Sequence, residues 1–172
     1  MAKVVLVHGA FNELWGPNEL KARWLPALRD GLAHHGGWID AEDVSVCFYG
    51  DLFRLDPETV DAEAWARTRA GTSEMLESLA DGGGLETLSQ AASEAAFDRT
   101  VDLVAILSSQ PAVASTSRHR LVEAIGDGVC AVVAHSLGTV LSYNTLVAHP
   151  ELEVDTLVTL GSPLGSAMTD PM

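Results

Sequence analysis

The sequence predicts an α/β protein, with three layers (α/β/α) built around a mainly parallel sheet. Two observations predict this class. Four short runs are rich in valine, leucine and other strand-forming residues, and most are continuous apolar stretches, as in strands covered on both faces. Segments with a helical pattern lie between these runs. Strands that alternate with helices form parallel sheets through right-handed crossovers.

The strands and helices can be placed in chain order. Strands are expected in the four apolar runs, at Lys3–Val7, Val44–Tyr49, Val129–Ala134 and Val154–Leu160. Helices are expected at Asn18–His35, which stops before two glycines, and at Thr139–Ala148. Further helical pieces, among them Ala62–Leu79 and Leu85–Phe97, lie between the second and third strands. The apolar run Val101–Leu107 suits a strand or a buried helix, since periodicity does not separate the two in a short run.

Length and composition indicate one globular domain. The chain has 172 residues, of which 47% are apolar and 20% charged, so it is expected to fold as a single domain over residues 1–172. The stretch at about 51–128 is longer than a crossover helix needs and contains a glycine cluster at Gly82–Gly84. We expect a helical excursion there, which would either cover a binding cleft as a lid or pack against the sheet edge.

Charge and cysteine content exclude several classes of protein. The formal net charge of −14 repels phosphate backbones, so nucleic acid is not expected as a partner. Cys47 and Cys130 are too few for a disulfide framework or a cysteine-rich zinc site. No apolar run has the length of a membrane span or of a signal-peptide core. A cytoplasmic chain with no membrane span is therefore expected, and the sequence does not indicate an oligomeric state.

The third expected strand runs directly into a helical pattern through His135-Ser136-Leu137-Gly138. This arrangement matches the nucleophile elbow Gly-x-Ser-x-Gly, with Ala134 in place of the first glycine. Small residues are needed on both sides because the serine occupies a sharp, strained turn. Ser136 is the expected nucleophile, and the N–H of Leu137 is placed to face a developing oxyanion. The alternative is that Ser136 is an ordinary helix N-cap.

The first strand ends in His8-Gly9-Ala10-Phe11. A histidine and a glycine at this place are typical of the loop that supplies the second oxyanion donor next to such an elbow. Gly9 allows a tight turn, and the N–H of Ala10 or Phe11 is expected to face the substrate oxygen. His8 is expected to shape this loop by hydrogen bonding rather than to act as a base.

Together these motifs resemble the α/β-hydrolase superfamily, and within it the lipase- and esterase-like members. The resemblance rests on Val7–Gly9, Ala134–Gly138 and the strand segment Leu157–Gly165, and it covers the first half of that fold. It implies the spatial strand order second-first-third-fourth. It also implies hydrolysis of a small-molecule carboxylic ester, with an apolar acyl group suggested, and no metal or cofactor. Four tryptophans outside the strands suit an apolar acyl pocket or plain helix packing: Trp15, Trp24, Trp38 and Trp65.

The resemblance also implies a triad in the chain order Ser, Asp or Glu, His. The only histidine after Ser136 is His149, about 20 Å away along the following helix, so it is a poor candidate base. Asp170 is a candidate acid, although an Asp-Pro pair there also suits a turn. We therefore expect a hydrolase-like fold that is incomplete at its C-terminus, with the triad histidine supplied from elsewhere. The alternative is a catalytically incomplete hydrolase-like domain that serves as a binding or interaction module.

Overall fold

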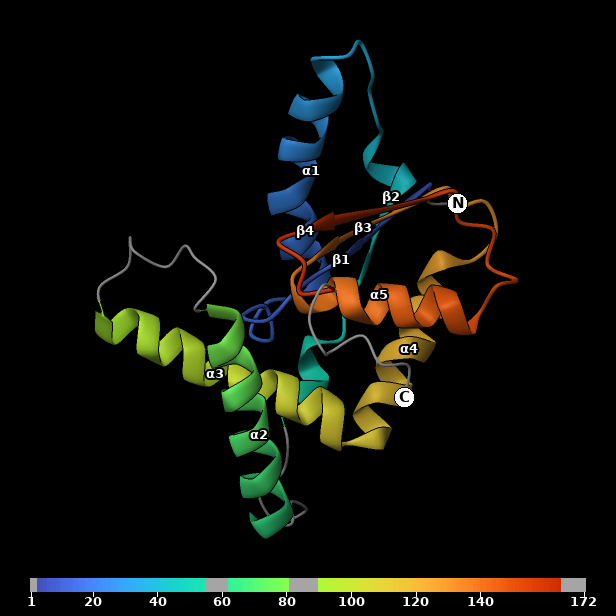
Figure 1. The fold of residues 1–172 in the computed structure, drawn as a ribbon. Helices are drawn as coiled ribbons and strands as arrows, with labels where there is room; N and C mark the ends of the chain where they lie inside the picture. Colours follow the sequence, from blue (N-terminus) through green and yellow to red (C-terminus); the bar gives the residue numbers. More distant parts are fainter. Residues whose placement is uncertain (1–2, 55–61, 81–89, 165–172) are drawn as a thin grey trace. The chain divides into compact units, whose positions relative to one another are not determined.

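The computed structural model describes residues 3–54, 62–80 and 90–164 (Figure 1). The chain divides into two compact units. One consists of Met1–Asp51 and Thr116–Met172, and the other of Leu52–Ser115. The first unit contains the sheet, the elbow around Ser136 and the loop that begins at His8.

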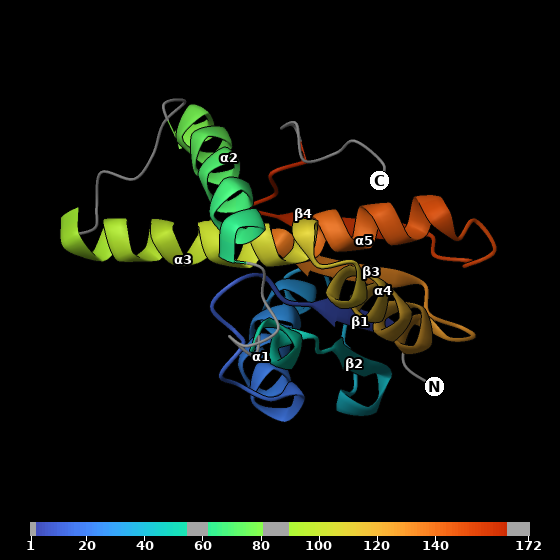
Figure 2. The ribbon, with the colours of Figure 1, turned by 90° about the horizontal axis from the view of Figure 1, so that it is seen from below.

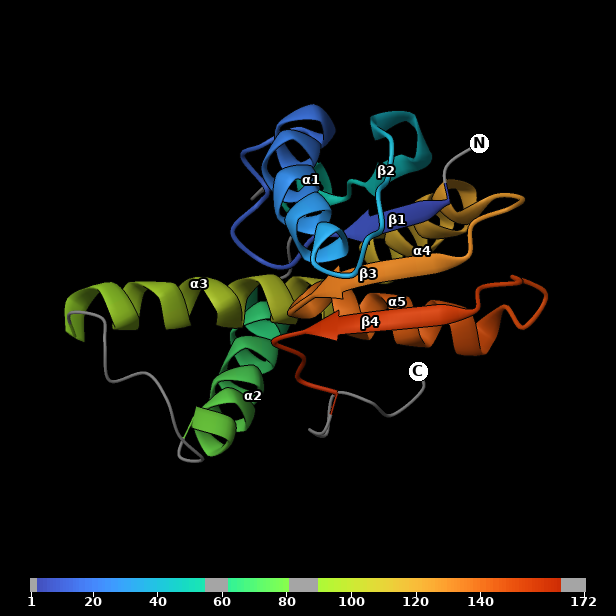
Figure 3. The same cartoon turned by 90° about the horizontal axis from the view of Figure 1, so that it is seen from above.

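The first unit is built on a parallel sheet of four strands. They are β1 (Val4–Val7), β2 (Val44–Cys47), β3 (Ala131–His135) and β4 (Thr156–Leu160), each at one of the four predicted apolar runs. Every neighbouring pair is parallel, and the order across the sheet is β2-β1-β3-β4 (Figure 3). This is the predicted order, and it shows the α/β class.

Helices cover both faces of this sheet. On one face, α1 (Pro17–Ala33) packs Leu25 against Leu6 and Val44. On the other face, α5 (Leu137–Ala148) lies against β1, β3 and β4 (Figure 2). Val5, Val7 and Val132 are fully buried, as expected for central strands with no solvent-facing side. The edge strand β4 is less covered, and Val158 and Leu160 are exposed.

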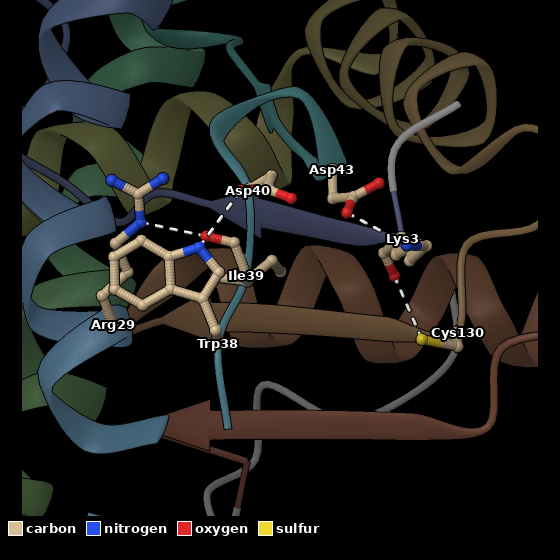
Figure 4. Close-up of polar contacts among 7 residues, drawn as sticks. All are labelled: Lys3, Arg29, Trp38, Ile39, Asp40, Asp43 and Cys130. Atoms are coloured by element: carbon tan, nitrogen blue, oxygen red, sulfur yellow. Dashed lines mark hydrogen bonds and ion pairs between the residues drawn. The ribbon is translucent and has the colours of Figure 1, made fainter. Parts of the chain in front are cut away.

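The start of β2 is tied to α1 and to the start of β1 by polar contacts (Figure 4). Arg29 donates from Nε to the Ile39 carbonyl at 2.9 Å, and its guanidinium lies 4.5 Å above the ring of Trp38. Lys3 Nζ pairs with Asp43 at 3.0 Å. These contacts align the amino ends of β1 and β2, so that their carboxyl ends, from which His8 and Tyr49 follow, lie together.

The second unit is helical in its described part. It contains α2 (Ala62–Ala80), α3 (Gln90–Ser109) and the first residues of α4 (Pro111–Ile125), whose remainder belongs to the first unit. Arg69 on α2 pairs with Asp98 at 3.0 Å and with Asp102 at 2.7 Å, and so joins α2 to α3. Val101–Leu107, which suited either state, is part of α3.

In residues 3–54, 62–80 and 90–164, none of the helices is both long and apolar enough to cross a bilayer.

Candidate active site

Ser136 links β3 to α5 in a strained conformation. Its backbone angles are φ 50° and ψ −122°, a combination that glycine adopts readily and other residues rarely do. The Ser136 N–H donates to the Leu160 carbonyl at 2.9 Å. The Ser136 carbonyl accepts from the Thr139 N–H at 2.9 Å and from the Thr139 hydroxyl at 2.6 Å. These bonds hold the strained turn, whose cost is about 1–3 kcal/mol.

Two glycines allow the turn to approach the end of β1 closely. A Cβ at Gly138 would overlap the His8 carbonyl oxygen and would lie 2.6 Å from that of Val7. A Cβ at Gly9 would lie 2.8 Å from Ser136 Cβ and 2.9 Å from the His135 carbonyl oxygen. Both positions therefore exclude any larger side chain unless the backbone moves.

The other two elbow residues lie on opposite faces of β3. Ala134 is fully buried and is paired in register with Val7 and Thr159, so the methyl group fits where the elbow pattern has glycine. His135 is exposed, and its ring meets that of Trp24 edge-to-face, with centroids 6.2 Å apart. His135 therefore lies on the side of the sheet that carries α1.

The loop after β1 is held in a fixed shape by Asn12. Its side-chain amide donates to the Gly9 carbonyl at 3.1 Å and to the Ala10 carbonyl at 2.9 Å. In a trans peptide the N–H points opposite to the carbonyl, so the N–H groups of Ala10 and Phe11 face away from Asn12. Phe11 itself has φ 68°, a second strained residue in this region. The loop thus presents two oriented N–H groups near the elbow.

His8 is buried, and both of its ring nitrogens have partners. Nδ1 donates to the Gly9 carbonyl at 2.8 Å, and Nε2 accepts from the Tyr49 N–H at 3.2 Å. Burial lowers the pKa of His8 below its ordinary value, so the neutral ring is favoured. Because neither nitrogen is free, His8 shapes the loop and is not available as a base to Ser136.

Asn12 and Tyr49 shape the site, although neither belongs to a sequence motif. Tyr49 donates its hydroxyl to the His8 carbonyl from the segment that follows β2. Asparagine in a loop after glycine often bonds to nearby backbone groups. The position of Asn12 in the sequence is therefore a signal for its role. The sequence contains no signal for the contact between Tyr49 and His8, because the two residues are 41 positions apart in the chain.

The segment after β4 is also bound to the elbow. The hydroxyls of Thr139 and Ser162 are 2.8 Å apart, and Ser162 Oγ accepts from the Leu164 N–H at 3.2 Å. Gly161, between β4 and Ser162, has φ 54°, which favours glycine. The chain therefore turns sharply at Gly161 and returns over the start of α5.

The other histidines, His34, His35, His119 and His149, make no hydrogen bond to Ser136 in the described part of the chain. His34 caps α1, His119 is 3.3 Å from Glu123 on α4, and His149 at the end of α5 pairs with Glu151 at 2.8 Å. Within the described part of the chain, no side chain hydrogen-bonds to Ser136 Oγ. The candidate acid Asp170 lies outside the described residues. The described structure thus contains the strained turn at Ser136 and the loop after β1, and no histidine or carboxylate in it is hydrogen-bonded to Ser136 Oγ.

A pocket of about 360 Å³ opens beside the elbow. Its lining residues come from the β1–α1 loop, α1, β3 and β4, and they are Asn12, Trp15, Arg23, Trp24, His135 and Leu160. Trp24 also packs against the apolar core beneath α1. The other two tryptophans lie outside this pocket, Trp38 being exposed beside Asp40 and Trp65 on α2.

The end of β2 is anchored by an ion pair. Arg120 binds the Asp51 carboxylate through both terminal nitrogens, with Nη2 to Oδ2 at 2.9 Å, and also donates to the Phe48 carbonyl at 3.1 Å. The hydrogen bonds that Arg120 donates to Asp51 are the main reason that the pKa of Arg120 is raised. Asp51 therefore fastens the β2 end to α4.

Among the residues described, no group of three or more His, Cys, Asp or Glu side chains is placed to hold a metal ion. Comparison with known proteins gives no match: no family model, curated protein or solved structure matches this chain.

Proposed function

We propose that the chain is a serine hydrolase of the α/β-hydrolase type that cleaves carboxylic esters, with Ser136 as its nucleophile. The observation that carries this proposal is the strained backbone of Ser136 between β3 and α5. An ordinary N-cap has extended backbone angles and a side chain that accepts a bond from the helix. Ser136 has neither, since its φ is 50° and it makes no capping hydrogen bond. Strain kept at a strand-to-helix turn is typical of functional positions.

The geometry supports a conventional acyl transfer. Ser136 Oγ attacks the ester carbonyl carbon, and its proton passes to a base. The carbonyl oxygen becomes an oxyanion, stabilised by the N–H of Leu137 and by that of Ala10 or Phe11. The N–H groups at the start of α5 suit this role, because they lack acceptors within the helix and lie at the positive end of its dipole. The tetrahedral intermediate expels the alcohol, which takes the proton, and water then releases the acid.

In this proposal the base is a group that makes no contact with Ser136 in the described part of the structure. His8 cannot act, because both ring nitrogens are bonded to backbone groups. His149 is bonded to Glu151 at the far end of α5. A serine hydroxyl without a base is a weak nucleophile, so the activity depends on this additional group.

A different observation favours a second candidate function. A hydrolase-like domain that retains the elbow without a base would serve as a binding or interaction module. The lack of any hydrogen bond to Ser136 Oγ within the described residues favours this candidate. The two functions differ in one measurable property, the reactivity of Ser136.

The test is the intact mass of the purified full chain after treatment with a fluorophosphonate, which labels only activated serines. The proposal expects one adduct on the unmodified chain and none on Ser136→Ala. Ser162→Ala is the matched control, because this hydroxyl lies beside the elbow and bonds to Thr139; it should keep the adduct. An unmodified chain that stays unlabelled would contradict the hydrolase and favour the binding module.

A further inference from the structure

The pocket beside the elbow is joined to Ser136 through three of its lining residues. His135 precedes Ser136 directly in the chain. The carbonyl of Leu160 accepts the Ser136 N–H at 2.9 Å. Asn12 fixes the carbonyls of Gly9 and Ala10 and thereby the loop that touches Ser136. A molecule in this pocket therefore lies next to the nucleophile and the oxyanion loop.

The wall of the pocket is mainly aromatic. Trp15 and Trp24 contribute two indoles and His135 an imidazole. The rings of Trp24 and His135 are nearly perpendicular, at 85°, and form a corner. Leu160, with 46% of its surface exposed, supplies an apolar side.

Among the described residues of the lining, Arg23 carries a full charge, and this charge is already compensated. The guanidinium of Arg23 lies 3.7 Å above the ring of Trp15, and its Nε pairs with Glu19 at 2.8 Å. The Arg23 guanidinium thus stacks on one indole and is paired with Glu19. It is not an unpaired cation that would select an anion. The pocket is therefore suited to a neutral, apolar group.

We infer that this pocket binds an aromatic ring of the ester substrate, so that the substrate class is an aryl or arylalkyl ester. That the ligand is an ester rests on the proposed function. That it carries an aromatic ring rests on the pocket alone. A flat ring can stack on one wall of the corner and present its edge to the other, as aromatic pairs prefer. A flexible alkyl chain of equal size gains no such geometry and loses more conformational freedom when it binds.

The test uses two neutral alcohols that no hydrolase can cleave. Benzyl alcohol and cyclohexylmethanol have the same carbon count and differ in the aromaticity of the ring. Each is titrated into the full ¹⁵N-labelled chain while the four indole N–H signals are followed, one for each tryptophan. Trp38→Phe and Trp65→Phe identify the two signals from outside the pocket, and individual substitution of the remaining tryptophans assigns the other two.

The inference expects benzyl alcohol to shift the Trp15 and Trp24 signals and to leave those of Trp38 and Trp65 in place. It expects benzyl alcohol to bind about 2- to 10-fold more tightly than cyclohexylmethanol. Leu160→Ala should weaken binding several-fold. Val147→Ala, an exposed apolar residue on α5 outside the pocket, should leave it unchanged.

Equal affinity for the two alcohols, or equal shifts at all four indoles, would overturn the inference. Ser136→Ala separates this test from that of the proposed function, because it should bind benzyl alcohol as the unmodified chain does. Binding at Trp15 and Trp24 without a fluorophosphonate adduct would support the aromatic site and contradict the proposed hydrolase activity. An adduct without such binding would support the proposed hydrolase activity and contradict the aromatic site.

Discussion

The backbone N–H of Tyr49 donates to Nε2 of His8 at 3.2 Å, and the Tyr49 hydroxyl donates to the His8 carbonyl. The two rings also stack, with centroids 4.1 Å apart and planes 12° from parallel. These contacts join the carboxyl ends of β1 and β2. They fix the backbone at His8, against which Gly138 packs, and so they set the position from which the loop after β1 starts.

The contact with Tyr49 makes the stability of the protein sensitive to acid through His8. Burial lowers the folded-state pKa of His8 below 6.5, its ordinary value, and only the neutral ring can accept from the Tyr49 N–H. The hydrogen bond to the Gly9 carbonyl and the negative charges of Glu13 and Asp51 oppose this shift of the His8 pKa without reversing it. Between the folded and unfolded pKa values, the unfolded chain binds more protons, so the free energy of unfolding falls as the pH drops below about 6.5.

This dependence can be measured by urea unfolding between pH 8 and pH 5. In that range His8 contributes at most about 1.4 kcal/mol per pH unit. In His8→Gln the amide oxygen can still accept from Tyr49 but does not titrate, so the fall in stability below pH 6.5 should be shallower. A ¹⁵N-resolved titration of His8 gives an independent check in the unmodified chain. An ordinary or raised pKa of the ring would contradict the prediction.

Replacing Gly138 with alanine should destabilise the fold by several kcal/mol. The added Cβ would meet the carbonyl oxygens of Val7 and His8, which are backbone atoms that cannot rotate away. Gly31→Ala is the matched control, because Gly31 lies inside α1 and a Cβ added there would meet no atom within 4 Å. Alanine there should stabilise the helix by about 1 kcal/mol.

Thermal unfolding of the two alanine variants beside the unmodified chain is sufficient to test this pair. The midpoint should fall markedly for Gly138→Ala and rise for Gly31→Ala. Similar midpoints for the two variants would mean that the close approach of α5 to β1 is not needed for folding.

Replacing Ser136 with glycine should increase stability while removing any reactivity. Glycine adopts φ 50° without the steric cost that serine bears, a relief of about 1–3 kcal/mol. The greater backbone freedom of glycine in the unfolded chain offsets about 0.5–1 kcal/mol of this. A net gain of about 1 kcal/mol in the free energy of unfolding is therefore expected, measured by urea denaturation.

Ser136→Ala is the control for this change, because alanine removes the hydroxyl but retains the Cβ and hence the strain. It should leave the stability close to that of the unmodified chain. If the glycine variant were no more stable than the alanine variant, the turn would hold no strain, and the main support for the proposed nucleophile would be lost.

Local sequence determined the strands and the place of the elbow. Each strand of the sheet is a short apolar run, and burial on both faces of a parallel sheet requires such runs. Small residues around Ser136 mark the sharp turn because larger ones would collide there. These features depend on neighbours in the chain, so a pattern of a few residues carries them.

Tertiary structure decided the rest. Val101–Leu107 became a helix, although its composition also suited a strand. The partners of His8, the role of Asn12 and the pocket that gathers Trp15, Trp24, His135 and Leu160 all depend on which segments the sheet places side by side. Contacts between residues far apart in the chain form only when the strands align. A hydrogen bond or a stacked ring of this kind leaves no periodic trace in the sequence, and the physical reason is that it depends on distance in space and not along the chain.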